Sequence, residues 1–217
     1  MTGIRWQRLV RHFRAGSATK VGHYPMSMPW RLVEAGFLIA DLFFVPELLM
    51  ALNRLFKPYT RRLLPREIAL ARTVFGESID YQKVRVDERS YIGCKQYHFA
   101  YVGFRFINCW GALSDQHFIH ELVHVWQYAR DGSVYIPRAL WAQRTTAGYN
   151  YGGIAALRRV LEQGRGLEAF NYEQQGDIVA DYFCLMHGIR PRWCAPDREQ
   201  LPVFESIIKG FSGDILH

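Results

Sequence analysis

Three histidines and one glutamate stand within the apolar stretch HFIHELVHVWQ, residues His117–Gln127. His120, Glu121 and His124 form the pattern HExxH. Residues four apart on a helix point to the same face. The two imidazoles would therefore lie one turn apart, close enough to share a zinc ion at about 2.0–2.1 Å each. Glu121 would project beside them as the general base that takes a proton from a zinc-bound water.

A motif as short as HExxH also occurs by chance. A third ligand is needed to support its interpretation as a metal site. The downstream segment NYEQQGDIVADYF places Glu173 and Asp177 four residues apart, on one face of a predicted helix. We predict Glu173 as the third zinc ligand. Asp177 would accept the second ring N–H of a zinc histidine and so set its tautomer. The alternative is a core helix with satisfied histidines and an unrelated glutamate; the two segments together favour the metal.

Other polar side chains near these segments could complete a site. A catalytic zinc keeps one coordination position open for water, so we place His117 at the rim and not among the ligands. Gln127 is expected to pack or to hydrogen-bond to the following connector, Trp126 to lie in the core, and Asp181 to be a further partner or a cap. The candidates to stabilise an oxyanion are Tyr149, Tyr151, Tyr172 and His187.

The elements that would position these residues follow from turn signals and periodicity. Ser114 offers a cap for the HExxH helix. The predicted elements, in chain order, are a helix from Pro65 to about Gly76, a strand in 80–86, a strand over Tyr97–Asn108 with Gly103 as a bulge or bend, the HExxH helix, an aromatic connector over 135–153, a helix over 154–163 and a helix over 172–188.

Basic charge is concentrated at the N-terminal end. Residues 1–66 contain 11 Lys/Arg and 3 Asp/Glu, whereas the other 151 residues contain 16 and 17. A basic arm suggests an acidic partner or an anionic lipid surface, although a solvated positive face has the same composition. Nucleic acid is not an expected partner. The start of the chain has no apolar core of the kind that a cleaved signal peptide needs.

The stretch Glu34–Phe56 is strongly apolar, yet Asp41, Pro46 and Glu47 interrupt it. A membrane-spanning helix needs about 20 mostly uncharged residues. We therefore predict two helices, broken near Pro46, that fold back on the rest of the chain with Asp41 and Glu47 turned outward. The side chains expected to be buried by this packing are Phe37, Leu38, Leu42 and Leu49. A membrane-surface or anchoring role is the alternative.

The four cysteines, Cys94, Cys109, Cys184 and Cys194, include no CxxC pair, which argues against a cysteine zinc site. Four cysteines in 217 residues do not form a disulfide framework. The count is compatible with a reducing compartment and does not exclude one or two bridges.

The segments FGESIDYQKVRV, FIHELVHVWQYARDG and NYEQQGDIVADYF, in this order, resemble a bacterial group of zinc metallopeptidases associated with Rhs/Vgr proteins and contractile injection systems. The resemblance covers about residues 63–188, and its most specific features are HExxHxxQ and EQQxDIxADYF. It implies a zincin fold, zinc on His120, His124 and Glu173, Glu121 as the base, and a link to type VI or related secretion systems. Residues 1–62 lie outside it.

We therefore expect an α+β, zincin-like fold in residues 63–217, helix-rich with a small twisted sheet, preceded by a basic, apolar helical extension in residues 1–62. The expected activity is zinc-dependent hydrolysis of an amide bond in a protein or in a peptidoglycan peptide. The alternatives are a non-catalytic injection-system component with structural zinc and a membrane-associated accessory protein. A secretion-system component or an immunity protein is a further expected partner. We expect the protein in the bacterial cytoplasm before export, with periplasmic action or membrane association possible afterwards.

Overall fold

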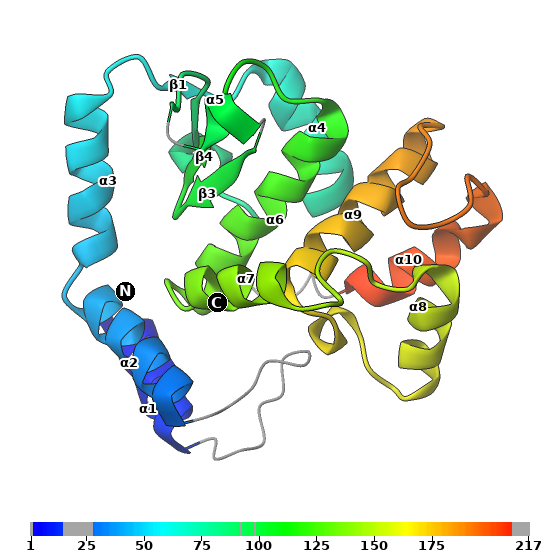
Figure 1. Ribbon diagram of the computed structural model, residues 1–217, viewed down its shortest axis with the longest axis horizontal. Helices are drawn as coiled ribbons and strands as arrows, with labels where there is room; N and C mark the ends of the chain where they lie inside the picture. Colours follow the sequence, from blue (N-terminus) through cyan, green and yellow to red (C-terminus); the bar gives the residue numbers. More distant parts are fainter. Residues whose placement is uncertain (1, 15–27, 92, 98, 210–217) are drawn as a thin grey trace.

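A computed structural model describes residues 2–14, 28–91, 93–97 and 99–209 of the chain. The described chain is rich in helix and has one small sheet (Figure 1). Its α-helices are α1 (Thr2–Arg14), α2 (Met28–Leu42), α3 (Val45–Phe56), α4 (Pro65–Phe75), α5 (Cys94–Tyr97), α6 (Asp115–Asp131), α7 (Tyr135–Arg144), α8 (Gly153–Glu162), α9 (Tyr172–His187) and α10 (Leu201–Ile208). Its strands are β1 (Arg61–Arg62), β2 (Arg85–Asp87), β3 (Tyr101–Gly103) and β4 (Phe106–Asn108).

Helices α6 and α9 pack against each other in the middle of the molecule (Figure 1). The Ser114 side chain accepts a hydrogen bond from the backbone N–H of His117 and caps α6. Asn171 and Gln174 form a capping box at the start of α9. Left-handed Gly188 ends α9. Local capping signals therefore set the ends of both helices, and the prediction of these two helices is confirmed.

The sheet has the strand order β1-β2-β4-β3. Strand β2 pairs in parallel with β4, whereas β1 and β3 are antiparallel to their neighbours. Strand β3 is therefore an edge strand, and it contacts α6 together with β4. The sheet thus places one edge beside the helix that carries HExxH.

The predicted single strand over Tyr97–Asn108 is wrong, because this segment forms the hairpin β3–β4 around Phe104 and Arg105. Gly103 is the last residue of β3, directly before the turn, so the chain bends next to it as expected, and it is not a bulge. Phe104 adopts a left-handed φ of 61°, and its backbone N–H donates to the Tyr135 hydroxyl at 3.0 Å. A contact from α7 therefore supports a turn that contains no residue typical of hairpin turns. His98 lies outside the described residues.

Two other segments differ from their expected form. Only Arg85–Asp87 is a strand at the end of the predicted 80–86 strand, and Tyr81–Lys83 is a turn of 3-10 helix. The segment expected as a connector, 135–153, begins with helix α7, which carries Pro137 in its first turn. The predicted helices at Pro65 and at 154–163 are confirmed as α4 and α8.

The N-terminal extension is largely helical over its described residues, as predicted, and its helix pair breaks near Pro46. Its last two residues, Arg61 and Arg62, instead form β1 and pair with β2. Phe44 is left-handed, with φ 58°, and Pro46 lies in the first turn of α3. Two buried carboxylates tie α2 to the rest of the chain. Asp41 accepts from the backbone N–H of Ser133 at 2.8 Å, and Glu34 pairs with Arg138 at 2.6 Å.

Two details of the predicted packing are wrong. Asp41 is only 3% exposed and points inward, because Ser133 satisfies its carboxylate. Leu49 is 47% exposed, since α3 turns that side of the helix to solvent. Leu38 is buried, and Phe37 and Leu42 are partly buried, as expected. Glu47 is half-buried and pairs with Arg5. The predicted basic start, from Arg5 to Lys20, lies outside the described residues beyond Arg14.

In the described part of the chain, no single helix has both the length and the apolar composition of a membrane span. The bent pair Pro29–Leu42 and Val45–Phe56, at 69°, meets those two criteria jointly. All four cysteines are free thiols.

Candidate metal centre

Three side chains from α6 and α9 converge as a possible metal site. The ligand atoms of His120, His124 and Glu173 all lie within 4.8 Å of one another, and all three residues are buried. Glu173 Oε2 lies 3.3 Å from His120 Nε2 and 3.5 Å from His124 Nε2. Two donors on a tetrahedral zinc, at bonds of about 2.0–2.1 Å, are separated by about 3.3 Å. The three residues therefore fit a zinc ion.

Each histidine has a partner on its other ring nitrogen. Asp177 Oδ1 lies 2.8 Å from His120 Nδ1, and Gln127 Oε1 lies 2.8 Å from His124 Nδ1. Gln127 donates through Nε2 to the Tyr172 carbonyl and to Gln175 Oε1, so its oxygen must face the histidine. Both partners thus accept an Nδ1–H and leave the Nε2 lone pairs free for a metal, as is usual in zinc sites.

Gly176 allows His120 to lie against α9. A Cβ atom at Gly176 would stand 2.5 Å from Cε1 and 2.7 Å from Nδ1 of the His120 ring. No real side chain tolerates such contacts, so only glycine permits this approach between the two helices. Gly176 lies between Glu173 and Asp177 on the same helix, and it therefore helps to bring the donors of α6 and α9 together.

The histidines and carboxylates of the cluster shift one another's pKa values. Burial by itself raises the pKa of Glu173, but His124 and His120 outweigh it and hold that pKa well below the usual range. Burial by itself lowers the pKa of His120, yet the bonds to Asp177 and Glu173 raise it to about 10. Glu173 Oε1 also accepts from Gln143 Nε2 at 2.9 Å, which leaves Oε2 directed at the histidines. Such a cluster stabilises a cation, either a proton or a metal ion.

Glu121 faces the same space but has a different environment. It is 7% exposed, and among the described residues its Oε2 has no hydrogen-bond partner. Burial raises the pKa of Glu121, although His120 and His124 act in the opposite direction. A buried carboxylate oxygen without a partner is costly unless a ligand or water completes it. The free Oε2 of Glu121 is therefore available to bind a water molecule.

A cavity of about 510 Å³ opens over these residues. Its walls come from β3 and the residues before it, from α6 and α7, and from Tyr149 and Arg192. Four apolar side chains on these walls are Phe99, Leu113, Ile136 and Leu140. A volume of this size accommodates a few residues of an extended peptide or a comparably sized molecule.

The other predicted residues divide into two groups. His117 and Tyr149 line the cavity, and the Tyr149 ring centroid lies 6.0 Å from that of His120. Tyr151 is buried away from it and donates to Asp181 at 2.8 Å. The Tyr172 hydroxyl donates to Asp131. His187 is exposed at the far end of α9 and packs on Phe183. The last three are therefore poorly placed to stabilise an oxyanion at the cluster.

Asp181 and Trp126 have structural roles: Asp181 binds backbone N–H groups, and Trp126 packs in the core. Asp181 accepts from the backbone N–H groups of Arg192 and Trp193, at 2.6 and 2.9 Å, and so holds the loop after α9 against that helix. From this loop the Trp193 indole N–H donates to Asp177. Trp126 is 2% exposed and lies in the core.

Several contributing residues were not anticipated from the sequence. Gln127 was expected only to pack or to bond to the connector, although its place three residues after His124 in HExxHxxQ could have indicated a partner for that ring. Gly176, between the two carboxylates of EQQGD, is a second signal that could have been used. Gln143 and Trp193 carry no such signal, because their contacts with Glu173 and Asp177 depend on α7 and on the loop after α9.

Part of the chain is similar to a much longer protein, the type VI secretion system spike protein VgrG2b of Pseudomonas aeruginosa strain PAO1. The two are 40% identical over 135 residues, which cover 57% of this chain and 13% of the relative. The chain thus spans only a small part of that protein's length. No family model matches the chain. No solved structure matches it either.

Proposed function

We propose that this chain is a zinc metallopeptidase of the zincin type, which hydrolyses an amide bond in a protein or in a peptidoglycan peptide. The observation that carries the proposal is the convergence of His120, His124 and Glu173 beside the unpartnered carboxylate oxygen of Glu121, on one wall of an open cavity. The similarity to a type VI secretion spike protein supports the further proposal that the enzyme acts with such a system.

The chemistry follows from the donor set. A zinc ion held by His120, His124 and Glu173 would supply Lewis-acid activation of the amide carbonyl and of a water molecule. Glu121 holds the attacking water through its free Oε2, takes its proton, and passes that proton to the departing amine nitrogen. Burial raises the pKa of Glu121, which favours uptake of that proton.

Residues around the cluster assist in two ways. Asp177 and Gln127 keep the imidazole rings oriented, so that their Nε2 atoms stay directed at one point. Tyr149, on the cavity wall next to His120, is the best placed of the predicted hydroxyl groups to donate to the developing oxyanion. His117, also on the wall, is the second candidate for this role.

An extended substrate would lie along the edge strand β3 and its preceding residues, which form one side of the cavity. The Val102 carbonyl already accepts from the Tyr135 hydroxyl at 2.7 Å. We therefore expect backbone pairing with the residues before Val102. The apolar wall that includes Phe99 and Leu140 favours substrates with an apolar side chain next to the cleaved bond.

A non-catalytic protein with structural zinc is the main alternative. Structural zinc sites are closed by four protein ligands, whereas catalytic sites use three and leave one position open. Within the described residues, the cluster offers three donors beside a cavity, with a carboxylate next to them that is not a ligand. These features favour catalysis over a structural role.

The experiment compares the parent protein with Glu121→Gln. Purified protein is assayed for zinc content and for cleavage of an unfolded protein and of isolated peptidoglycan. We expect Glu121→Gln to keep zinc and fold but to lose about 10²- to 10⁴-fold in hydrolysis, because an amide cannot accept the proton. Glu162→Gln, an exposed position on α8, is the matched control and should cleave like the parent.

Two results would overturn the proposal. One is cleavage by Glu121→Gln at the parent rate. The other is a zinc-loaded parent that cleaves neither substrate, which would support the structural alternative.

A further inference from the structure

Helix α3 presents its apolar side to solvent and its polar side to the protein. An amphipathic helix on a globular protein normally does the opposite. At 100° per residue, the apolar residues fall on one stripe. The exposed members of this stripe and its entry turn include Phe43, Leu48, Leu49, Leu52, Leu55 and Phe56, with exposed fractions between 39% and 75%. Pro46 is the buried residue of the helix.

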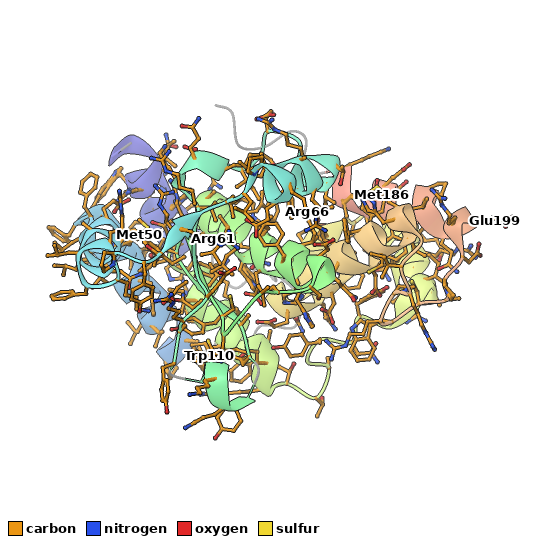
Figure 2. The ribbon with its side chains drawn as sticks, turned by 90° about the horizontal axis from the view of Figure 1, so that it is seen from above. Met50, Arg61, Arg66, Trp110, Met186 and Glu199 are labelled. Atoms are coloured by element: carbon orange, nitrogen blue, oxygen red, sulfur yellow. The ribbon has the colours of Figure 1, made fainter. Side chains whose placement is uncertain are left out.

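In Figure 2, α3 is seen end-on, at the label Met50. Side chains of this helix project outward from the molecule there. Figure 1 shows α3 at the periphery, away from α6 and α9. An exposed apolar stripe of this length is typical of a site that binds another protein or a membrane.

The opposite side of α3 borders a basic cavity of about 560 Å³. Glu47, Met50, Ala51 and Arg54 form the α3 wall of this cavity. Its other cationic side chains are Arg5, Arg8, Lys83, Arg85 and Arg105, against two carboxylates, Asp41 and Glu47.

Both carboxylates of this cavity are already engaged. Asp41 accepts from Ser133, and Glu47 pairs with Arg5. In contrast, none of Arg54, Arg85 and Arg105 forms an ion pair with a carboxylate of the described residues. Burial and the neighbouring Arg54 and Arg62 lower the pKa of Arg85, as expected where positive charge is uncompensated. The cavity therefore has an excess of positive charge that would attract phosphate groups.

We propose that α3 lies in the interface of an anionic phospholipid leaflet, with its apolar stripe among the acyl chains and the basic cavity at the level of the lipid phosphates. A helix is about 10 Å in diameter, and interfacial helices sink about 5–10 Å into the headgroup region. The cationic side, opposite the apolar stripe, then faces the phosphates. Cations on one face and large apolar residues on the other are the pattern of helices that lie on a membrane surface.

Anchoring within one leaflet agrees better with the contacts than a span does. Helix α3 has 12 residues and is therefore about 18 Å long, shorter than the hydrocarbon core of about 30 Å. Joining α2 to α3 in one straight span would require α2 to leave the protein. That movement would break the buried contacts of Asp41 with Ser133 and of Glu34 with Arg138. The geometry thus assigns α2 to the protein and α3 to the lipid.

The test uses the full chain and vesicles of phosphatidylcholine, with or without 30–40% phosphatidylglycerol (about one lipid in three, enough for a negative surface potential). Sedimentation gives the fraction bound. We expect binding to the anionic vesicles, weaker binding to the neutral ones, and loss of the difference at high salt. Absence of binding to anionic vesicles, or equal binding to both, would overturn the proposal.

Two pairs of variants separate the apolar and the charged contributions. Leu52→Gln with Leu55→Gln should lower the partition coefficient at least about tenfold, because two apolar side chains no longer enter the lipid. Ile189→Gln, an exposed apolar residue outside α3, is the control and should bind like the parent. Arg54→Gln with Arg105→Gln should lower binding about 30-fold at low salt, whereas Arg158→Gln with Arg159→Gln on α8 should change it little.

Circular dichroism and the Tm of each variant check that the fold persists, which is expected because the changed α3 side chains are exposed. Light scattering without lipid tests the competing occupant, a second copy of the chain. A dimer in the parent that Leu52→Gln with Leu55→Gln converts to a monomer would overturn the proposal and assign the stripe to self-association. Binding that this double variant leaves unchanged would also overturn it.

Discussion

The α6–α9 pair buries polar side chains, whereas the α1–α3 extension exposes apolar ones. In the pair, histidines and carboxylates are buried, and nearly all have identified partners, such as Asp177 on His120 and Gln127 on His124. In the extension, α3 leaves large apolar side chains in solvent and turns its polar side inward. Both arrangements are costly for an isolated chain.

The difference shows two ways in which a structure can point to a missing partner. A buried cluster of acids and imidazoles around one point calls for a cation, since its carboxylates would otherwise repel one another. An exposed apolar stripe over a basic cavity calls for a surface that is apolar and anionic. The two sites share no residue, so each can be changed by substitutions outside the other.

The largest expected effect is loss of the metal. The parent should bind about one zinc per chain, and His120→Ala, His124→Ala and Glu173→Ala should each lose nearly all of it, because three protein ligands hold the ion. Metal analysis after dialysis gives the occupancy. His187→Ala, at the exposed end of α9, is the control and should keep its zinc. Full occupancy in Glu173→Ala would move the third ligand elsewhere, with Asp177 the first candidate.

A second prediction compares two glycines, one in each region. Gly176→Ala places a Cβ atom within 2.5–2.9 Å of three His120 ring atoms. We expect zinc affinity to fall by about 100-fold, near the upper end of overpacking costs, because the ring is also fixed by Asp177. In α2, a Cβ atom at Gly36 meets nothing within 4 Å, so Gly36→Ala should raise helix stability by about 0.5–1 kcal/mol.

Zinc titration and thermal unfolding measure both glycine variants. If Gly176→Ala binds zinc like the parent, then His120 does not need this close approach to α9.

The third prediction concerns the orientation of one ligand. Asp177→Asn should weaken zinc affinity or activity by about 10- to 100-fold while the protein stays folded, since a neutral amide is a poorer acceptor for the His120 N–H. Competition with a chelator of known affinity measures the change. Asp80→Asn, at an exposed carboxylate, serves as the control. An unchanged affinity would mean that Asp177 does not orient His120.

The last prediction tests whether the two regions are energetically linked. Asp41→Ala removes the acceptor of the Ser133 N–H and should lower the free energy of unfolding by about 2 kcal/mol, because that donor becomes unsatisfied. Zinc content should not change, as Asp41 is not part of the metal cluster. Urea unfolding with parallel metal analysis checks both statements. A simultaneous loss of zinc would show that the extension supports the metal site.

The helices of the chain could largely be predicted from its sequence, whereas the connections between them could not. Capping residues such as Ser114 and Asn171 act over three or four positions, so α6 and α9 begin where local signals place them. The hairpin turn at Phe104 depends on the hydroxyl of Tyr135, which is 31 positions away. Helix α7 was missed for a related reason: no side-chain cap marks its start, and it packs against α6 and α9.

By itself, the sequence determined which side chains could bind a metal, because a helix repeats every 3.6 residues and brings i and i+4 to one face. This rule places His120 next to His124, and Glu173 next to Asp177. Only the tertiary structure decided that these two faces meet, that Gln143 from α7 holds Glu173, and that α3 turns its apolar stripe outward. The physical reason is the sequence range of the interactions. Helix periodicity depends on residues three or four positions apart, whereas the contact of two helix faces depends on packing between segments far apart in the chain.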